Sequence, residues 1–204
     1  MTRWRWRLLQ ALIRFGGRLF WRIRVTGVEN VPTSGGVLLA ANHQSYLDPP
    51  LIGPHLRGEM HFMARRTLFK NPLFGALIGR CNAFAIERDT ADVKGVKNAI
   101  DRLQRGKILL VFPEGTRTRD GTVGRMKAGI GILAERAAVP IVPVLIEGAY
   151  EVWPKGALIP RLGKSRLVFG KPMRPEMIAG DGLRKAVLSL KTEGDRTGCL
   201  TESS

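Results

Sequence analysis

Short apolar stretches alternate with stretches of helical periodicity through most of this 204-residue sequence, and this alternation limits the fold more than any other feature. Strands are indicated by WRIRVTG, GGVLLAA, HFMAR, AFAIE, KILLVF, VPIVPVLIEG and SRLVFGKP. Between them, TLFKNPLFGALIG, DVKGVKNAIDRLQRG and KAGIGILAERAA have the composition and spacing of helices. The continuous apolar run in KILLVF suits a strand buried on both faces, whereas the prolines of VPIVPVLIEG suggest an edge strand. The pattern predicts one α/β domain with a mixed or largely parallel sheet flanked by helices.

The first 24 residues contain seven arginines and no acidic residue. On a helical wheel of about 100° per residue, five of these arginines share one arc, and leucine, isoleucine and phenylalanine cover the opposite side. Gly16 and Gly17 predict a break or hinge in this helix. A basic face, an apolar face and tryptophans at one end are typical of a helix that lies in a membrane interface. The alternative is an ordinary helix that packs on its own domain and leaves its arginines in water.

The domain boundaries follow from this reading. Residues 1–24 are expected to be the amphipathic membrane-interface segment, residues 25–191 the α/β domain, and residues 192–204 a flexible tail that includes GDRTGCLTESS. The two cysteines, Cys81 and Cys199, lie far apart and show neither a disulfide framework nor metal-ligand spacing, so we expect a reducing compartment and no metal site. No apolar run approaches the roughly 20 residues that span a bilayer.

The formal net charge is +16, from 33 lysines and arginines against 17 acidic residues. Such an excess predicts an anionic partner, which leaves nucleic acid, an acidic membrane surface and phosphorylated substrates as candidates. Nucleic acid is the weakest of these, because the sequence contains no nucleic-acid-binding motif and its few aromatic residues lie mostly in apolar settings.

The stretch NHQSYLDPP, residues 42–50, places His43 five positions before Asp48. If a strand-to-helix turn separates them, Asp48 can hold one imidazole nitrogen and leave the other free to take a proton. The alternative is that Asp48 caps a helix opened by Pro49 and Pro50, and that His43 is an ordinary loop residue. These nine residues alone leave both interpretations open.

Three further stretches carry charged side chains near the ends of expected strands. VFPEGTRTRDG, residues 111–121, combines a glycine that lets backbone approach a ligand with an arginine that suits phosphate. Arg88 follows the strand AFAIE, and Arg65 lies in ARRTLFKNP beside Arg66 and Lys70. Each stretch taken alone is also consistent with a polar turn or a solvated charge cluster.

Taken together, NHQSYLD, FMARRTLF, AFAIER, FPEGTR and VPIVPV occur in an order that resembles the successive blocks of the glycerolipid acyltransferase family. The resemblance extends over about residues 25–172, up to LVFGKP. It implies that His43 is the general base and that Asp48 orients it. It also implies that Pro140 belongs to the acyl-donor side or to the structure, and that the acceptor is bound by a set of polar and basic residues: Arg65, Arg88, Glu114, Gly115, Thr116, Arg117 and Lys127.

The resemblance implies a reaction as well. A fatty acyl group moves from a thioester, carried by coenzyme A or acyl carrier protein, to the free hydroxyl of a lysophospholipid, and 1-acyl-glycerol-3-phosphate would give phosphatidate. The acyl thioester is a substrate, so no cofactor is expected. Backbone N–H groups near Gly115, or a helix N-terminus, are the expected stabilisers of the oxyanion. We expect a peripheral enzyme on anionic lipids at the cytoplasmic face of a membrane. The alternatives are an acyltransferase for another lyso-lipid acceptor and, from a different class, a basic nucleic-acid-binding domain.

Overall fold

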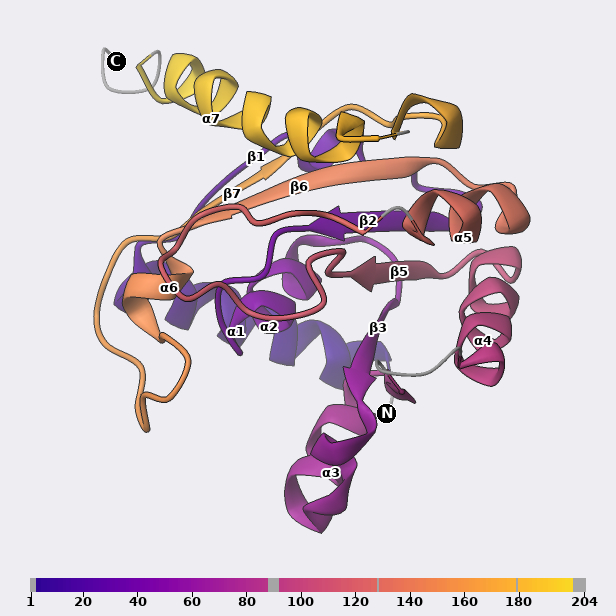
Figure 1. Ribbon diagram of the computed structural model, residues 1–204. Coiled ribbons are helices and arrows are strands. Elements are labelled where there is room, and N and C mark those ends of the chain that lie inside the picture. Colours follow the sequence, from indigo (N-terminus) through magenta and orange to yellow (C-terminus); the bar gives the residue numbers. More distant parts are fainter. Residues whose placement is uncertain (1–2, 88–91, 128, 179, 200–204) are drawn as a thin grey trace.

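The computed structural model describes residues 3–87, 92–127, 129–178 and 180–199. Its centre is a seven-stranded sheet in the order β1-β7-β6-β2-β5-β3-β4 (Figure 1). Every neighbouring pair is parallel except β6 and β7, which are antiparallel. The strands are β1 (Arg24–Thr26), β2 (Val37–Ala41), β3 (Met60–Arg65), β4 (Ala83–Ile86), β5 (Ile108–Val111), β6 (Ile141–Glu147) and β7 (Arg166–Phe169). The predicted α/β fold with a largely parallel sheet is confirmed.

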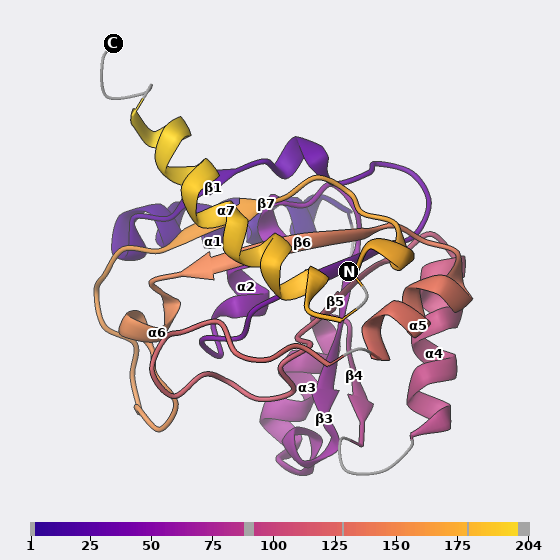
Figure 2. The same ribbon diagram turned by 45° about the horizontal axis from the view of Figure 1, so that its top comes forward.

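Helices cover both faces of the sheet. The α-helices are α1 (Arg3–Trp21), α2 (Asp48–Ile52), α3 (Pro72–Arg80), α4 (Val93–Gln104), α5 (Gly129–Ala137), α6 (Ala149–Val152) and α7 (Gly182–Cys199). In Figure 1, α1, α2 and α3 lie below the sheet and α7 above it. Figure 2 shows α7 lying across the strands, with α5 and α4 beside it at one end.

The apolar core has two layers because successive strand residues point to opposite faces. Leu38 and Ala40 of β2 belong to the cluster under α4, α5 and α7, whereas Val37, Leu39 and Ala41 belong to the cluster toward α1, α2 and α3. All five residues are fully buried. A strand buried on both faces accounts for the unbroken apolar run of its sequence.

The topology gathers several loops at one edge of the sheet. β2, β5, β3 and β6 run in the same direction, so the segments that follow them leave from the same edge. The segment after β2 begins with Asn42 and His43, and the segment after β5 begins with Phe112 and contains Glu114. Loops at the carboxyl ends of parallel strands are the usual location of sites in α/β folds.

The edge-strand prediction for VPIVPVLIEG is wrong, because β6 lies inside the sheet between β7 and β2. Its register places Val144 opposite Phe169, so Pro143 falls one residue beyond the β6–β7 ladder. There its carbonyl accepts a hydrogen bond from the N–H of Gly170 at 2.9 Å. The N–H that proline lacks would point to the same side, so its absence falls at the end of the β6–β7 ladder and leaves the pairing of β6 with β2 intact.

Helix boundaries also differ from the sequence-based expectations. α1 runs through Gly16 and Gly17 without the predicted break, and Gly17 is buried where a Cβ would lie 2.5 Å from Ile23 Cδ1. Arg24 begins β1, so the first segment ends before residue 24. α7 continues through residues 192–199 where a flexible tail was predicted, and residues 200–204 lie outside the described residues. In the part of the chain that the structure describes, no helix is long and apolar enough to cross a bilayer.

Candidate active site

Asn42 directly follows β2, and its side chain makes the hydrogen bonds to β6 that the main chain would make in a longer strand. Its Nδ2 donates to the carbonyl of Ile146 at 2.8 Å, and its Oδ1 accepts from the N–H of the same residue at 2.8 Å. The side chain is fully buried and continues the pairing with β6 for one step after the β2 backbone turns away. This anchor fixes where the next residue, His43, leaves the sheet.

His43 and Asp48 form a close pair. His43 Nδ1 lies 2.7 Å from Asp48 Oδ2, and the same oxygen accepts the main-chain N–H groups of Gln44 at 2.7 Å and Ser45 at 2.9 Å. Asp48 is fully buried, and its side chain does not cap α2. When Nδ1 of His43 donates to this carboxylate oxygen, the neutral imidazole carries its proton on Nδ1 and presents Nε2 as an acceptor.

Three more contacts hold His43 in place. Its ring stacks on Phe112 with centroids 3.9 Å apart and planes 15° apart. Its carbonyl accepts the N–H of Thr118 at 2.8 Å, and its N–H donates to Glu114 Oε1 at 3.3 Å. The segment after β5 therefore binds both the N–H and the carbonyl of His43. Together with the stacking on Phe112, these bonds restrict rotation of the ring away from Asp48.

Glu114 is tied to this loop and has an unusual acidity. Burial raises its pKa to about 7, against the smaller opposing effect of hydrogen bonds from the main chain of His43 and Gly124. The negative charges of Asp48 and Asp120 add to the rise. Near neutral pH, a substantial fraction of Glu114 is consequently uncharged.

Arg117 contributes a cation to the site. It directly precedes Thr118, whose N–H donates to the carbonyl of His43. Its Cζ stands 3.5 Å above the ring centroid of Tyr46, and the Tyr46 ring meets Trp153 edge-on at 6.0 Å. Its Nη1 is buried and has no hydrogen-bond partner among the described residues. A stacked guanidinium with an unused buried donor is well suited to an anionic ligand.

Gly115 lies in the turn between Glu114 and Arg117, and Lys127 approaches it from further along the chain. Gly115 has φ 71°, and a Cβ there would lie 3.3 Å from Lys127 Nζ, so the missing side chain allows the lysine to approach. The N–H of Gly115 donates to the carbonyl of Phe112 at 3.0 Å. This N–H is therefore already used within the turn, which weighs against Gly115 itself as the oxyanion donor.

The other predicted site residues are placed less closely around His43. Thr116 is exposed on the turn, and Arg65 is exposed at the carboxyl end of β3, two strands from β2. Arg66 forms an ion pair with Glu87 at 2.7 Å. Arg88 lies outside the described residues, so its expected role in binding the acceptor stays a prediction.

Sequence reasoning overlooked the buried residues that shape the loop. Gln44 Oε1 accepts the N–H groups of Ala149 and Tyr150, and its Nε2 donates to the carbonyl of Gly121 at 2.9 Å. Ser45 Oγ donates to the carbonyl of Trp153 at 2.9 Å. Polar residues in succession directly after a buried strand were the available signal, since buried polar groups require partners.

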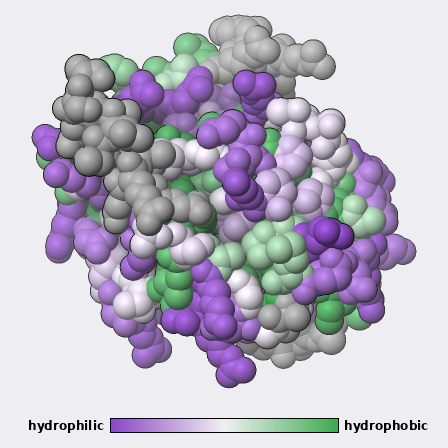
Figure 3. Space-filling model, turned by 90° about the horizontal axis from the view of Figure 1, so that it is seen from above, coloured by the Kyte–Doolittle hydropathy of each residue, from purple (hydrophilic) through white to green (hydrophobic). Residues whose placement is uncertain are grey.

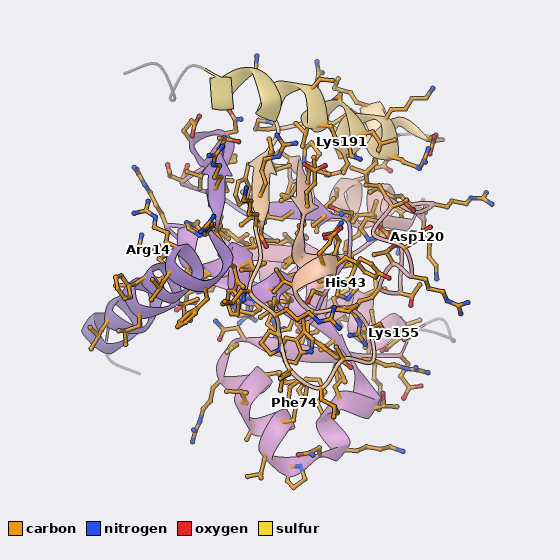
Figure 4. The ribbon with its side chains drawn as sticks, turned by 90° about the vertical axis from the view of Figure 1, so that its left-hand side faces the viewer. Arg14, His43, Phe74, Asp120, Lys155 and Lys191 are labelled. Atoms are coloured by element: carbon orange, nitrogen blue, oxygen red, sulfur yellow. The ribbon has the colours of Figure 1, made fainter. Side chains whose placement is uncertain are left out.

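Figure 4 shows His43 near the middle of the face that carries α1 and α3, with Arg14, Phe74 and Lys155 on three sides in that view. Within the described residues, no group of three or more histidine, cysteine, aspartate or glutamate side chains is arranged to hold a metal ion. What the site contains is a histidine held by a buried carboxylate, and beside it a stacked arginine and a lysine.

Comparisons with known proteins give the same indication. The family model described as Acyltransferase matches residues 22–147. The 1-acyl-sn-glycerol-3-phosphate acyltransferase of Bacillus subtilis (strain 168) is 30% identical over 152 residues, which is 74% of this chain and 73% of that protein. The chloroplastic enzyme LPAT1 of Arabidopsis thaliana is 29% identical over 158 residues, and the match covers 76% of this chain but only 44% of the plant protein.

A solved structure extends the likeness to the fold. The crystal structure of the 1-acyl-sn-glycerophosphate (LPA) acyltransferase PlsC from Thermotoga maritima has a TM-score of 0.72 and is 33% identical. The match covers 95% of this chain and 82% of that one. Because the family model spans more than half of the sequence, and a relative 30% identical matches most of both lengths, this chain belongs to the acyltransferase family.

Proposed function

We propose that this acyltransferase moves a fatty acyl group from an acyl thioester to the free hydroxyl of 1-acyl-sn-glycerol-3-phosphate and so produces phosphatidate. The observation that carries the proposal is the 2.7 Å contact between His43 Nδ1 and the buried Asp48 carboxylate. Its support comes from relatives in Bacillus subtilis and Thermotoga maritima whose names carry this activity.

In the proposed reaction, His43 Nε2 removes the proton of the acceptor hydroxyl as the oxygen attacks the thioester carbonyl carbon. A C–O bond forms, and the carbonyl becomes a tetrahedral oxyanion. When it collapses, the C–S bond breaks, and the thiolate takes the proton held by the imidazolium. Asp48 stabilises the imidazolium during the interval in which His43 is charged. The acceptor attacks directly, so no protein nucleophile or cofactor takes part.

The acceptor phosphate has candidate ligands beside the base. Arg117 contributes a stacked guanidinium with an unused buried N–H, and Lys127 contributes an ammonium group over Gly115. We assign Glu114 to positioning, because it accepts the N–H of His43. We keep three further residues as proposed acceptor ligands. Thr116 is next to Arg117 in the sequence, and Arg65 and Arg88 follow from the resemblance to the family and stand in the sequence at or after the ends of strands of the same sheet.

The location of the acyl chains suggests where the enzyme works. α1 leaves five large apolar side chains exposed, Leu8, Leu12, Phe15, Leu19 and Phe20, on a segment rich in arginine. We propose that α1 lies flat on anionic lipid as a peripheral anchor. Since coenzyme A and acyl carrier protein deliver acyl groups from the cytoplasm, the proposed location is the cytoplasmic face of the membrane.

The test is a product analysis. Purified enzyme is incubated in detergent with lysophosphatidate and, separately, with other lysophospholipids and a lyso-aminolipid, each with acyl-coenzyme A or acyl carrier protein as donor. Mass spectrometry should detect phosphatidate as the main product. The His43→Ala protein, whose main-chain contacts to Thr118 and Glu114 do not involve the imidazole, should remain folded and inactive. Product from another lyso-lipid alone would keep the chemistry and replace the acceptor; a folded, fully active His43→Ala enzyme would refute the mechanism.

A further inference from the structure

Two apolar surfaces besides α1 are left exposed on the side of the sheet that bears α1, α2 and α3. On α3, Leu73 is 84% exposed and Leu77 is 59% exposed. In the loop that follows α6, Leu158 is 93% exposed and Ile159 is 74% exposed. We call these the α3 patch (Leu73, Leu77) and the loop patch (Leu158, Ile159). Large side chains grouped in this way on one side of a protein mark an interaction surface more often than isolated ones do.

The charge on the same segments is of one sign. Residues 1–24, 66–82 and 153–165 together contain thirteen of the 33 basic residues and none of the 17 acidic residues. The rest of the chain is therefore close to balanced, and almost all of the positive excess lies on the three segments that also expose apolar side chains. Apolar side chains set among cations, without a compensating acid, match a bilayer that contains anionic lipid.

The loop and α1 are physically joined. Trp21 Nε1 donates to the carbonyl of Arg161 at 3.1 Å, and the N–H of Gly163 donates to the carbonyl of Phe20 at 3.3 Å. The N–H of Ser165 donates to the carbonyl of Trp21 at 3.0 Å. The exposed apolar side chains of α1, which reach Leu19 and Phe20 at this end of the helix, therefore lie close to residues 161–165 at the end of the loop.

The same loop is joined to the active site at its other end. Ser45 Oγ donates to the carbonyl of Trp153, and the Tyr46 ring meets the Trp153 ring. On the α3 side, Ile78 packs on the same core cluster as Trp21, Trp153 and Phe112, the residue on which His43 stacks. The three segments therefore share one layer of the molecule with the catalytic pair, and Figure 4 shows α1, α3 and the loop on one side of the protein. Figure 3, which looks at the opposite side over α7, shows a mostly hydrophilic face with smaller apolar areas.

We infer that the α3 patch and the loop patch dock on the bilayer together with α1, so that lipid surrounds the side of the molecule on which His43 lies. α1 is then one of three contacts, and the acceptor reaches the base from the membrane without crossing water. The inference rests on the proposed function for its choice of a lipid partner. A second copy of this chain fits less well, because two surfaces of equal positive charge repel each other.

Flotation with vesicles tests the inference. The full-length chain carries Leu73→Gln with Leu77→Gln in one variant and Leu158→Ser with Ile159→Ser in another, and α1 is unchanged in both. The matched control carries Val93→Gln and Ile132→Gln, which are 74% and 54% exposed on α4 and α5. Binding is measured without substrate to vesicles of phosphatidylglycerol and phosphatidylcholine. Each patch variant should bind about tenfold more weakly or worse, because each removes two large apolar groups from the bilayer contact, and the control should bind like the unaltered chain.

A fluorescent reporter gives a positive signal for the same contact. In a chain that carries Cys81→Ser and Cys199→Ser, an environment-sensitive dye attached to Leu158→Cys should shift to shorter wavelength on vesicles, and the same dye on Ile132→Cys should not. Unchanged flotation of both patch variants would overturn the inference and leave α1 as the anchor. Vesicle binding that is weakened equally in the control variant would also overturn the inference. So would a sedimentation result in which the unaltered chain is a dimer and the patch variants are monomers, because the patches would then join two copies of the chain. Because binding is measured without substrate, an enzyme inactive on lysophosphatidate in detergent would refute the proposed function and leave this result standing.

Discussion

At the scale of single residues, the His43–Asp48 contact, which the proposed mechanism uses for proton transfer, also stabilises the fold. The Asp48 carboxylate holds the imidazole, and it also satisfies the N–H groups of Gln44 and Ser45 in a buried loop. Substitutions at this position can separate the two tasks, because asparagine retains an oxygen that accepts from main-chain N–H groups but has no charge to stabilise an imidazolium.

Asp48→Asn should therefore fold and lose turnover. We expect kcat to fall by roughly 10²–10⁴-fold, as when a carboxylate that orients a catalytic histidine becomes an amide. Asp48→Ala should in addition unfold more easily, since each buried N–H left without a partner costs about 1–3 kcal/mol. Steady-state kinetics and urea denaturation measure the two effects. An Asp48→Asn enzyme that turns over normally would remove Asp48 from the mechanism.

Arg117 should act on the acceptor and not on the acyl donor. Arg117→Ala removes a stacked, charge-assisted contact, so kcat/KM for the acceptor should fall by a factor that corresponds to about 1.5–3 kcal/mol. Arg117→Lys should recover only part of the loss, because lysine cannot reproduce the planar fork over Tyr46. Arg119→Ala, which removes an exposed cation two residues away, is the matched control. Equal rises in the KM of both substrates would contradict the assignment.

Glu114 should make the folded protein less stable as pH rises. Its pKa is about 7 in the folded protein against 4.5 for the ordinary group, so the folded state binds more protons between these values. The free energy of unfolding should then decrease from about pH 4.5 to about pH 7 and level off above. Glu114→Gln carries no proton to lose, so its stability relative to the original chain should rise across that window. Parallel melting-temperature profiles for the two proteins would contradict the raised pKa.

At the scale of elements, α1 is attached to the domain by one face and leaves another free. Gly17 is buried and Trp21 bonds to the loop, whereas Leu12 and Phe15 are 59% and 68% exposed. Arg14 and Arg18 lie near the face of α1 that packs on the domain. Burial, and then the positive charges of these two arginines, lower the pKa of His55 to about 4. Deleting residues 1–24 would remove the Trp21 contact and the first residue of β1 along with the anchor, so substitutions are the cleaner probe.

Leu12→Gln combined with Phe15→Gln should weaken binding to anionic vesicles while the domain stays folded, because exposed positions contribute little to stability. Activity on acceptor in a bilayer should drop further than activity on acceptor in detergent. A companion variant, Gly17→Leu, should instead loosen α1 from the domain, since its side chain would collide with Ile23. Vesicle flotation and thermal melting distinguish the two. Full vesicle binding by the first variant would count against α1 as an anchor.

The sequence predicted elements well where the apolar pattern was strong. Six of the seven strands lie within the predicted stretches, because each is a short apolar run bounded by turn residues, and β3 begins one residue before its stretch, at Met60. α6 escaped notice because four residues carry no helical period. α7 was not predicted at all, although Leu183, Val187 and Leu190, which it buries, have the spacing of one helix face. Pro143 led to the wrong prediction that β6 is an edge strand. A proline is tolerated at this position because the ladder with β7 ends beside it, and the local sequence does not show where β7 ends.

The site was predictable to a similar degree. His43, Asp48, Glu114 and Arg117 came from the resemblance of their stretches to the blocks of the acyltransferase family, and the structure gathers them in one loop cluster. The contact between Arg117 and Tyr46 was not foreseeable, because it joins segments about 70 residues apart through the parallel sheet. The anchoring roles of Asn42 and Gln44 depend on partners in β6 and α6, about 100 residues further along the chain.

At the scale of the whole molecule, charge should govern where the protein resides. Binding of the full-length chain to vesicles containing anionic lipid should weaken as salt rises from 0.1 M to 1 M, because the Debye length shrinks from about 10 Å to about 3 Å. Vesicles of neutral phosphatidylcholine alone should bind less protein, with little dependence on salt. Flotation at both salt concentrations checks this. Equal binding to neutral and anionic vesicles would mean that the positive excess serves the substrates and not the membrane.

The pairing of His43 with Asp48 spans only five positions along the chain, whereas Arg117 is brought to them by the sheet. In the proposed mechanism, the pair that transfers the proton is therefore built within a single short loop, whereas the proposed head-group contacts come from another part of the chain. Mutations can then alter which lipid is accepted without rebuilding the base. After a gene duplication, one copy of such an enzyme could drift toward a new acceptor while its chemistry stayed intact throughout.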